Sequence, residues 1–406
     1  PGYTVPKVIE NYQRRFSVSY PNEELPAARG VRRTPMYNTF TSMGTVWGAQ
    51  FGLEVPNYFT KANEPNFETP SFRRSNAWEA IKREVKAVRQ GVGINEIHNF
   101  SKFLVTGPNA RRWLDRIMAG RIPKPGRLSL NPMLSHKGKI IGDFTVSCIS
   151  EGKFQLTASY GSQEYHRRWF EQNMEGSVQL KNISDRRNGF QIAGPKAAEV
   201  LQACTSTVIS EIRFLDVVEM VVGSTDCLVQ QVSYTGDHGF EIYCDPMAQH
   251  ALWDTLWTAG KAYKMAPFGM RAMMSLRLDR FFGSWRSEFS PDYTAAETGL
   301  ERFINFKKST DFIGRAVAEA ERANPPIRQL VVFEVDALDA DVVAYEPVFI
   351  NGEVQGFCTS GGYSHHADKS IAFALVPRSC VTDNLAAEIE ILGHRREAKI
   401  LLEPLL

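Results

Sequence analysis

The chain has 406 residues, of which 43% are apolar, and its 47 basic and 45 acidic side chains leave a formal charge of +2. This length can bury a large core and predicts two or three domains. No Lys/Arg block and no bilayer-length apolar run occurs, which argues against nucleic acid, a membrane surface or a membrane span. The composition therefore favours a soluble, cytoplasmic protein.

The six cysteines are scattered, and the eight histidines include one adjacent pair, His365-His366. In a chain this long, widely spaced cysteines are typical of reduced core residues. We therefore expect no metal site, and we interpret the histidine pair, which follows Ser-Gly-Gly-Tyr, as a solvated turn.

The first 75 residues are rich in Pro, Asn and Arg and predict loops that wrap a surface. Gly52–Phe59 is unusually apolar for such a loop and is expected to dock on the body. The clearest helix is Asn76–Gln90, which Asn76 would cap and Gly91 would end. Its apolar stripe comprises Ala77, Ile81, Val85 and Val88.

A pattern of strand, Gly-Pro and helix occurs twice. Phe103–Pro108 leads into a helix over Asn109–Met118, and Phe190–Pro195 leads into one over Lys196–Cys204. Proline suits a helix start because its missing N–H costs nothing there. Each copy continues with two strands and a helix, so the pattern predicts a pseudo-repeat of α/β units. The seam between the copies is a natural place for a ligand.

The last part of the chain has a different pattern. Ala266–Phe282 predicts a helix that carries several arginines, and Asn324-Pro-Pro326 is the best linker signal. Beyond it, short strands alternate with turns, which predicts a small β-barrel or sandwich.

Two carboxylates lie on short β-rich runs next to glycine-containing turns. Asp143 begins an apolar strand after Gly138–Gly142, and Glu241 lies within the second run, Ser233–Tyr243. A charge at a buried strand is costly without a partner or a ligand. The plainer alternatives are a turn cap for Asp143 and an exposed strand face for Glu241. Core packing is the default for Tyr234, and a surface salt bridge is the default for Arg271.

The chain has neither a dinucleotide-binding Gly-x-Gly-x-x-Gly after a strand nor a P-loop, and it lacks a Gly-x-Ser-x-Gly nucleophile motif. Strand-borne carboxylates with a tyrosine and nearby arginines suit a flat heteroaromatic ligand with a charged tail. One carboxylate can accept two ring N–H groups while an arginine holds a carboxylate at the other end.

The sequence resembles the glycine-cleavage T-protein (aminomethyltransferase) family in several ordered motifs: Gly138–Val146, Ser233–Ile242, Gly269–Leu278, Asp311–Arg315, and Thr359–His365 with Lys369–Ala372. It is more closely similar to the folate-binding C-terminal half of dimethylglycine and sarcosine dehydrogenases, with the markers Gly44–Phe59, Ser71–Arg74, Arg121–Lys124 and Phe282–Trp285. The resemblance covers nearly the whole chain.

The resemblance implies an α+β fold with three domains around a central folate channel, pseudo-repeated α/β units and a C-terminal β-barrel. It implies tetrahydrofolate as cofactor and Asp143 as the catalytic carboxylate. Tyr234 and Glu241 would hold the pterin, Arg271 would contact the ligand towards its glutamate tail, and Trp285 would also bind the cofactor.

Three positions depart from the family pattern. Asp237 stands where many members have Glu, Leu130 stands where related members carry a folate-contacting Tyr, and Gly142 replaces the first residue of an Asp-Asp pair. The fused dehydrogenases also carry an N-terminal flavin domain, and Tyr12–Arg33 resembles their interdomain linker. Because the first residue is Pro1, one hypothesis is the C-terminal part of a longer flavoenzyme. A separate subunit and a standalone demethylase are the others.

The sequence thus predicts an N-terminal extension or linker segment with a helix (1–91), a folate-binding region of two interwoven subdomains (92–323) and a β-barrel domain (324–406). The predicted activity is tetrahydrofolate-dependent one-carbon transfer in the demethylation of a small methylated substrate, with a flavin-containing oxidase domain or subunit as partner. The N-methyl amines dimethylglycine and sarcosine are the favoured substrates. The alternatives are a standalone O-, S- or N-demethylase that makes 5-methyltetrahydrofolate and a noncatalytic folate-binding regulatory protein.

Overall fold

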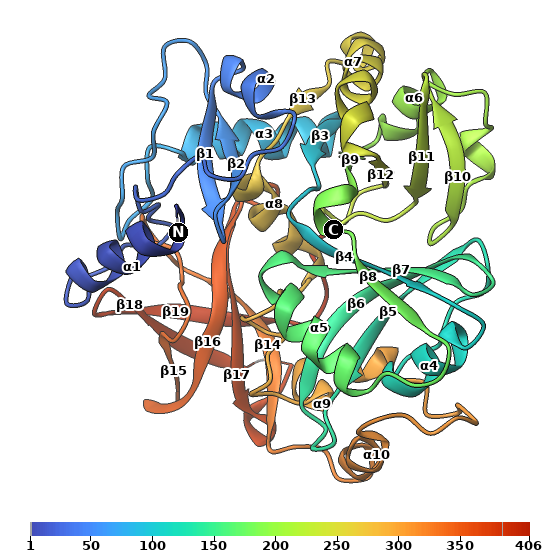
Figure 1. The fold of residues 1–406 in the computed structure, drawn as a ribbon. Coiled ribbons are helices and arrows are strands. Elements are labelled where there is room, and N and C mark those ends of the chain that lie inside the picture. The colour runs from blue at the N-terminus through green and yellow to red at the C-terminus, as the bar shows by residue number, and fades with distance from the viewer. Residues whose placement is uncertain (1, 384) are drawn as a thin grey trace.

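The computed structural model describes residues 2–383 and 385–406. Two sheets and a closed barrel surround helix α8 (Met270–Leu276), which lies near the centre of the view in Figure 1. The N-terminal part covers one side with helices α1 (Thr4–Gln13), α2 (Tyr37–Ser42) and α3 (Trp78–Gln90) and with the hairpin of β1 (Thr45–Gln50) and β2 (Leu53–Phe59).

The first sheet has six strands in the order β10-β11-β12-β9-β3-β13. Their bounds are β3 (Gly93–Glu96), β9 (Asn188–Ala193), β10 (Val217–Val222), β11 (Thr225–Gln230), β12 (Gly239–Cys244) and β13 (Ala266–Pro267). Helices α6 (Ala197–Gln202) and α7 (Gln249–Gly260) pack their apolar residues against one face, together with Met36, Phe40 and Phe59 from the N-terminal part.

The second sheet has five strands in the order β5-β6-β7-β4-β8. Their bounds are β4 (Phe100–Thr106), β5 (Arg127–Leu134), β6 (Ile140–Ser150), β7 (Lys153–Ser159) and β8 (Gln179–Asn182). Helices α4 (Ala110–Ile117) and α5 (Gln163–Gln172) cover one face and close a core around Phe103, Trp113 and Phe170.

The predicted pseudo-repeat is present in the backbone. Gly107 follows β4 with φ +127°, and Gly194 follows β9 with φ +124°. A Cβ at Gly107 would lie 2.2 Å from the carbonyl oxygen of Ser177, and one at Gly194 would lie 2.3 Å from that of Val88. Each glycine therefore permits the same tight passage from strand to helix, where a side chain would be strained and would clash.

The C-terminal domain is a closed barrel in the order β14-β17-β16-β15-β18-β19. Its strands are β14 (Arg328–Val335), β15 (Pro347–Ile350), β16 (Glu353–Ser364), β17 (Lys369–Pro377), β18 (Ala386–Ile391) and β19 (His394–Leu401). Helices α9 (Ala295–Thr298) and α10 (Arg315–Ala323) precede it. Of the two predicted architectures, barrel and sandwich, the structure has the barrel.

Several local predictions were wrong. The segment Gly52–Phe59 forms the buried strand β2 rather than a loop. Helix α3 begins at Trp78, because the Asn76 amide is bonded to the backbone of Thr69 and Phe67 instead of to the helix. The helix expected over Ala266–Phe282 is divided into β13, α8 and a 3₁₀ turn over Arg277–Arg280.

The interpretation of His365 as part of a solvated turn was also wrong. Its side chain is 8% exposed and lies 4.4 Å from the Trp78 ring and 5.1 Å from the Tyr363 ring, measured between centroids. Burial lowers its pKa to about 4, so this imidazole is neutral at physiological pH.

Candidate active site

Asp143 lies on the uncovered face of the second sheet. On β6, Phe144, Val146 and Cys148 enter the core below α4 and α5, and strand alternation places Asp143 and Thr145 on the opposite face. Burial raises the pKa of Asp143 from its ordinary value of 3.8 to about 7, opposed only by a hydrogen bond from its own backbone. This carboxyl can therefore exchange a proton near neutral pH.

The absence of a carboxylate at position 142 has a steric explanation. A Cβ at Gly142 would lie 2.5 Å from the Phe144 ring and 2.8 Å from Nε2 of His166. That nitrogen is 3.0 Å from the carbonyl oxygen of Ile141, and burial holds the pKa of His166 at about 3. A neutral imidazole thus occupies the space beside Gly142, and position 142 offers no carboxylate next to Asp143.

Tyr234 and Trp285 lie at the same end of β6 as Asp143. The Tyr234 hydroxyl donates to the carbonyl oxygen of Gly283 at 2.7 Å, two residues before Trp285. The Asp143 charge is among the causes that raise the pKa of Tyr234, after burial. The Trp285 ring packs edge-on against His166, with centroids 5.2 Å apart. The structure therefore brings three of the five predicted site residues together.

Glu241 lies on the first sheet, in the middle of a row of polar side chains. The strand register aligns Gln230, Glu241, Gln191 and Asn95 across four neighbouring strands. Both polar atoms of the Gln230 amide, and the amide oxygens of Gln191 and Asn95, are buried without a hydrogen-bond partner. Buried polar groups normally have partners, so this row fits the polar edge of a flat ligand.

The polar faces of the two sheets are turned towards each other. The Tyr243 hydroxyl, on β12, donates to Oε2 of Glu241 at 2.7 Å, and the Tyr243 ring centroid lies 5.9 Å from Nζ of Lys102 on β4 of the second sheet. Burial raises the pKa of Glu241 to about 7, and the Tyr243 hydrogen bond and the charge of Lys102 oppose this shift. Glu241 therefore lies on the polar face of the first sheet, and Asp143 lies on the polar face of the second.

Arg271 lies apart from this seam. Its guanidinium contacts the Glu68 carboxylate at 3.1 Å and donates to the side chain and backbone of Asn22 at 2.7 and 2.9 Å. It faces a cavity of about 970 Å³ whose lining includes Trp78, Tyr363 and residues of α8, but not Asp143, Tyr234, Glu241 or Trp285. A carboxylate ligand could reach Arg271 only by displacing Glu68.

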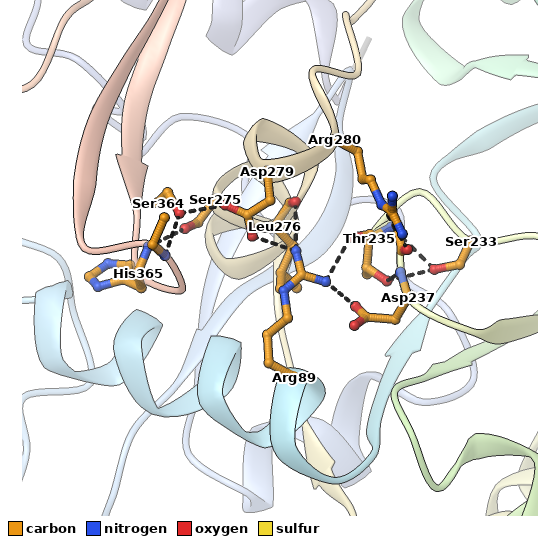
Figure 2. A network of polar contacts seen from close by, with 12 residues as sticks. Arg89, Ser233, Thr235, Asp237, Ser275, Leu276, Asp279, Arg280, Ser364 and His365 are labelled. Carbon is orange, nitrogen blue, oxygen red and sulfur yellow. Dashed lines mark hydrogen bonds and ion pairs between the residues drawn. The ribbon is translucent and has the colours of Figure 1, made fainter. Parts of the chain in front are cut away.

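The motif around Tyr234 is anchored by Arg89 of α3. Figure 2 shows the Arg89 guanidinium between two carboxylates, Asp237 on the motif turn and Asp279 after α8. It also donates to the carbonyl oxygens of Thr235 and Leu276, each at 3.0 Å. Asp279 in turn accepts from Ser364 of the barrel. Asp237, shorter than the Glu of many family members, thus has a structural role here.

A second buried ion pair holds the segment that carries Gly283 and Trp285. Arg277 lies 3.4 Å from Glu288, and both side chains are at most 1% exposed. Glu288 accepts from the Ser284 backbone at 2.9 Å and from two barrel hydroxyls, Thr359 and Ser360, at 2.6 Å each. The barrel therefore positions the loop that supports Tyr234.

The sequence analysis missed the polar row beside Glu241 and the buried Lys102. Alternation along each strand was visible in the sequence, but the register between distant strands was not. In the described part of the chain there is no cluster of three or more His, Cys, Asp or Glu side chains that could hold a metal ion. Every helix among those same residues is too short or too polar to cross a bilayer.

Comparison with known families assigns the fold. The GCVT N-terminal domain family matches residues 36–308, and the glycine cleavage T-protein C-terminal barrel domain family matches residues 328–406. The chain belongs to the glycine cleavage T-protein family. Aminomethyltransferase T of the glycine cleavage system from Bartonella henselae has a similar fold, with a TM-score of 0.80 at 21% identity over 93% of this chain and 98% of the other.

Two kinds of enzyme are among the relatives. Human mitochondrial dimethylglycine dehydrogenase is 36% identical over 409 residues, a match that covers 99% of this chain and 47% of the dehydrogenase. An aminomethyltransferase of Geobacillus sp. (strain WCH70) is 29% identical over 377 residues and is covered to 98%. The chain therefore spans about half the length of the dehydrogenases it matches. The predicted family and fold class are confirmed.

Proposed function

We propose that this T-protein family member transfers a one-carbon unit from a small methylated amine, such as dimethylglycine or sarcosine, to tetrahydrofolate. The observation that supports this proposal is that each of the two sheets carries one of the carboxylates on its polar face, Asp143 on β6 and Glu241 within the polar row. The unpartnered amide of Gln230 and the unpartnered amide oxygens of Gln191 and Asn95 fit a pterin ring, whose edge carries both donors and acceptors.

Each side of the seam has its own task. Glu241, with one oxygen engaged by Tyr243, keeps the other for the ligand, and Tyr234 and Trp285 would border the ring. Asp143, whose pKa is near 7, would hold or take a proton at the reacting folate amine and stabilise a developing cation beside it. Positioning of the one-carbon donor would supply much of the remaining rate.

The source of the one-carbon unit is proposed from its chemistry. Converting an N-methyl group to the methylene level removes two electrons, so an electron acceptor is required. Dimethylglycine dehydrogenases are about twice as long as this chain, which supports a flavin-containing oxidase domain or subunit as partner. We propose that Arg271 binds the charged tail of folate once Glu68 has moved away.

The test is incubation of the protein with tetrahydrofolate and a panel of methylated amines, sulfonium compounds and methoxy-aromatics, followed by mass spectrometry of the folates. Product that forms only with a flavin-containing amine oxidase supports the proposal. Methyl-folate formed without flavin would instead indicate a standalone demethylase. Folate binding without product under any condition would indicate a noncatalytic folate-binding protein.

A further inference from the structure

Lys102 is a buried lysine without an ion pair. It lies in the middle of β4, has no exposed surface, and donates from Nζ only to the carbonyl oxygens of His98 at 3.2 Å and Phe100 at 3.0 Å. Within residues 2–383 and 385–406, no carboxylate lies within ion-pair distance of this ammonium. Burying a charge in this way is costly, so the position favours a role that needs the charge.

The ammonium faces the polar seam from the second sheet. Its Nζ lies 5.9 Å from the centroid of the Tyr243 ring, close enough for a cation–π interaction. The Tyr243 hydroxyl donates to Glu241 at 2.7 Å, so the same tyrosine contacts the cation through its ring and the carboxylate through its hydroxyl. The hydroxyl thereby donates to an ionised acceptor, which makes this hydrogen bond stronger than one between neutral groups.

Four other charged or titratable groups lie near Lys102. Asp185 and Glu96 have partners of their own, Arg187 repels the Lys102 charge, and His98 is neutral. Asp185 is bonded to Arg32 at 2.7 Å, and Glu96 accepts from Gln249 at 2.6 Å. Among the carboxylates that stabilise the Lys102 charge, Glu241 has the largest effect. Within the described residues, Glu241 forms no ion pair with another cation.

We propose that Lys102 is a positioning residue for the folate site, whose buried ammonium keeps Glu241 as a carboxylate and directs the Tyr243 hydroxyl onto one of its oxygens. The other oxygen is thereby left for the N–H groups of the ligand. The effect of Lys102 on ligand binding rests on the proposed function. The coupling of Lys102 to Glu241 exists in the ligand-free protein and can be measured there.

The coupling predicts a pH-dependent effect. A protonated Glu241 cannot accept through both oxygens, so ligand binding weakens as the pH falls through the pKa of this carboxyl. Removing the Lys102 charge raises that pKa and moves the loss of binding to higher pH. Burial lowers the pKa of Lys102 to about 7, so its charge, and the effect of removing it, disappear at pH 9.

The experiment uses Lys102→Met, with Lys102→Gln as a second neutral variant in case methionine disturbs the packing. Lys181→Met, at an exposed position of the adjacent strand β8, is the matched control. Glutamate carboxyl ¹³C labelling and NMR give the titration midpoint of Glu241, with the signal assigned by its loss in Glu241→Gln. Tetrahydrofolate dissociation constants are measured at pH 7 and pH 9.

The expected result is a midpoint raised by about one unit. Tetrahydrofolate binding should weaken about fivefold at pH 7 and by less than twofold at pH 9, with Lys181→Met unchanged. An unmoved midpoint in both folded Lys102 variants, or a loss of affinity that is equal at both pH values, would overturn the proposal. Should the wild-type protein not bind tetrahydrofolate, the proposed function fails, while the midpoint still decides the role of Lys102.

Discussion

Replacing Asp143 by Asn separates the catalytic role of this residue from its cost to the fold. The pKa of Asp143 rises from 3.8 to about 7 on folding, and a shift of this size corresponds to about 4 kcal/mol above pH 7. Because the side chain keeps some exposed surface, we expect the buried carboxylate to lower the free energy of unfolding by about half of that value, roughly 2 kcal/mol. The folded state binds more protons between these pKa values, so this penalty grows as the pH rises and is complete above pH 7.

Asp143→Asn should therefore be more stable than the wild-type protein at pH 8, by roughly 2 kcal/mol, and this difference should be smaller at pH 5. Its one-carbon transfer should fall by about 10²- to 10⁴-fold, as is typical when an acid–base group is removed. Urea unfolding at both pH values and the folate mass assay measure the two effects. Asp226→Asn, at an exposed strand position, is the control.

Wild-type turnover should also fall as the pH drops through about 7, where Asp143 becomes protonated. The reasoning is refuted if the Asn variant keeps full activity, or if it is less stable than the wild-type protein at pH 8. Full activity would remove Asp143 from the mechanism, and lower stability would mean that the carboxylate has a partner that compensates its burial.

Three further substitutions test the surroundings of the site. Arg89→Met leaves two buried aspartates unpaired and should lower the free energy of unfolding by about 3–5 kcal/mol. Arg112→Met, at an exposed position of α4, should change it by less than about 0.5 kcal/mol in the same urea titration. Glu241→Gln should weaken tetrahydrofolate binding in calorimetry by about 10- to 100-fold, while the exposed Glu219→Gln should not weaken it. Arg271→Met should weaken it by about fivefold, because the lost tail contact is partly offset by the Glu68 contact that no longer has to be broken; an unchanged affinity would remove Arg271 from the site.

The elements that the sequence predicted correctly are those that depend on local chemistry. Gly107 and Gly194 mark the two strand-to-helix passages because no side chain fits there. The apolar run that includes Phe144 and Val146 forms β6, and the turn-separated strands after Asn324 form the barrel. Each of these features can be derived from a few neighbouring residues.

The features that the sequence did not predict depend on contacts between distant segments. Asn76 has the right chemistry for a helix cap, but its amide is used by a loop that folds back on it. His365 packs against two aromatic rings from different domains. The neighbours of Glu241 follow from strand register, which no single strand specifies.

The contacts of Arg271 likewise could not be predicted from its neighbours in the sequence. Its position on α8 placed it near the site, but its direction depends on Glu68 and Asn22, which the chain brings in from about 200 or more residues away. The seam and the cavity are consequently two distinct places where a folate could lie.

A crystal structure of the protein with 5-formyltetrahydrofolate, a stable folate, would show where the pterin ring binds. We expect the ring in the seam between the two sheets, hydrogen-bonded to Glu241 and next to Asp143. A pterin ring bound instead in the cavity between Arg271 and Tyr363, with Glu241 still without a ligand, would contradict this expectation.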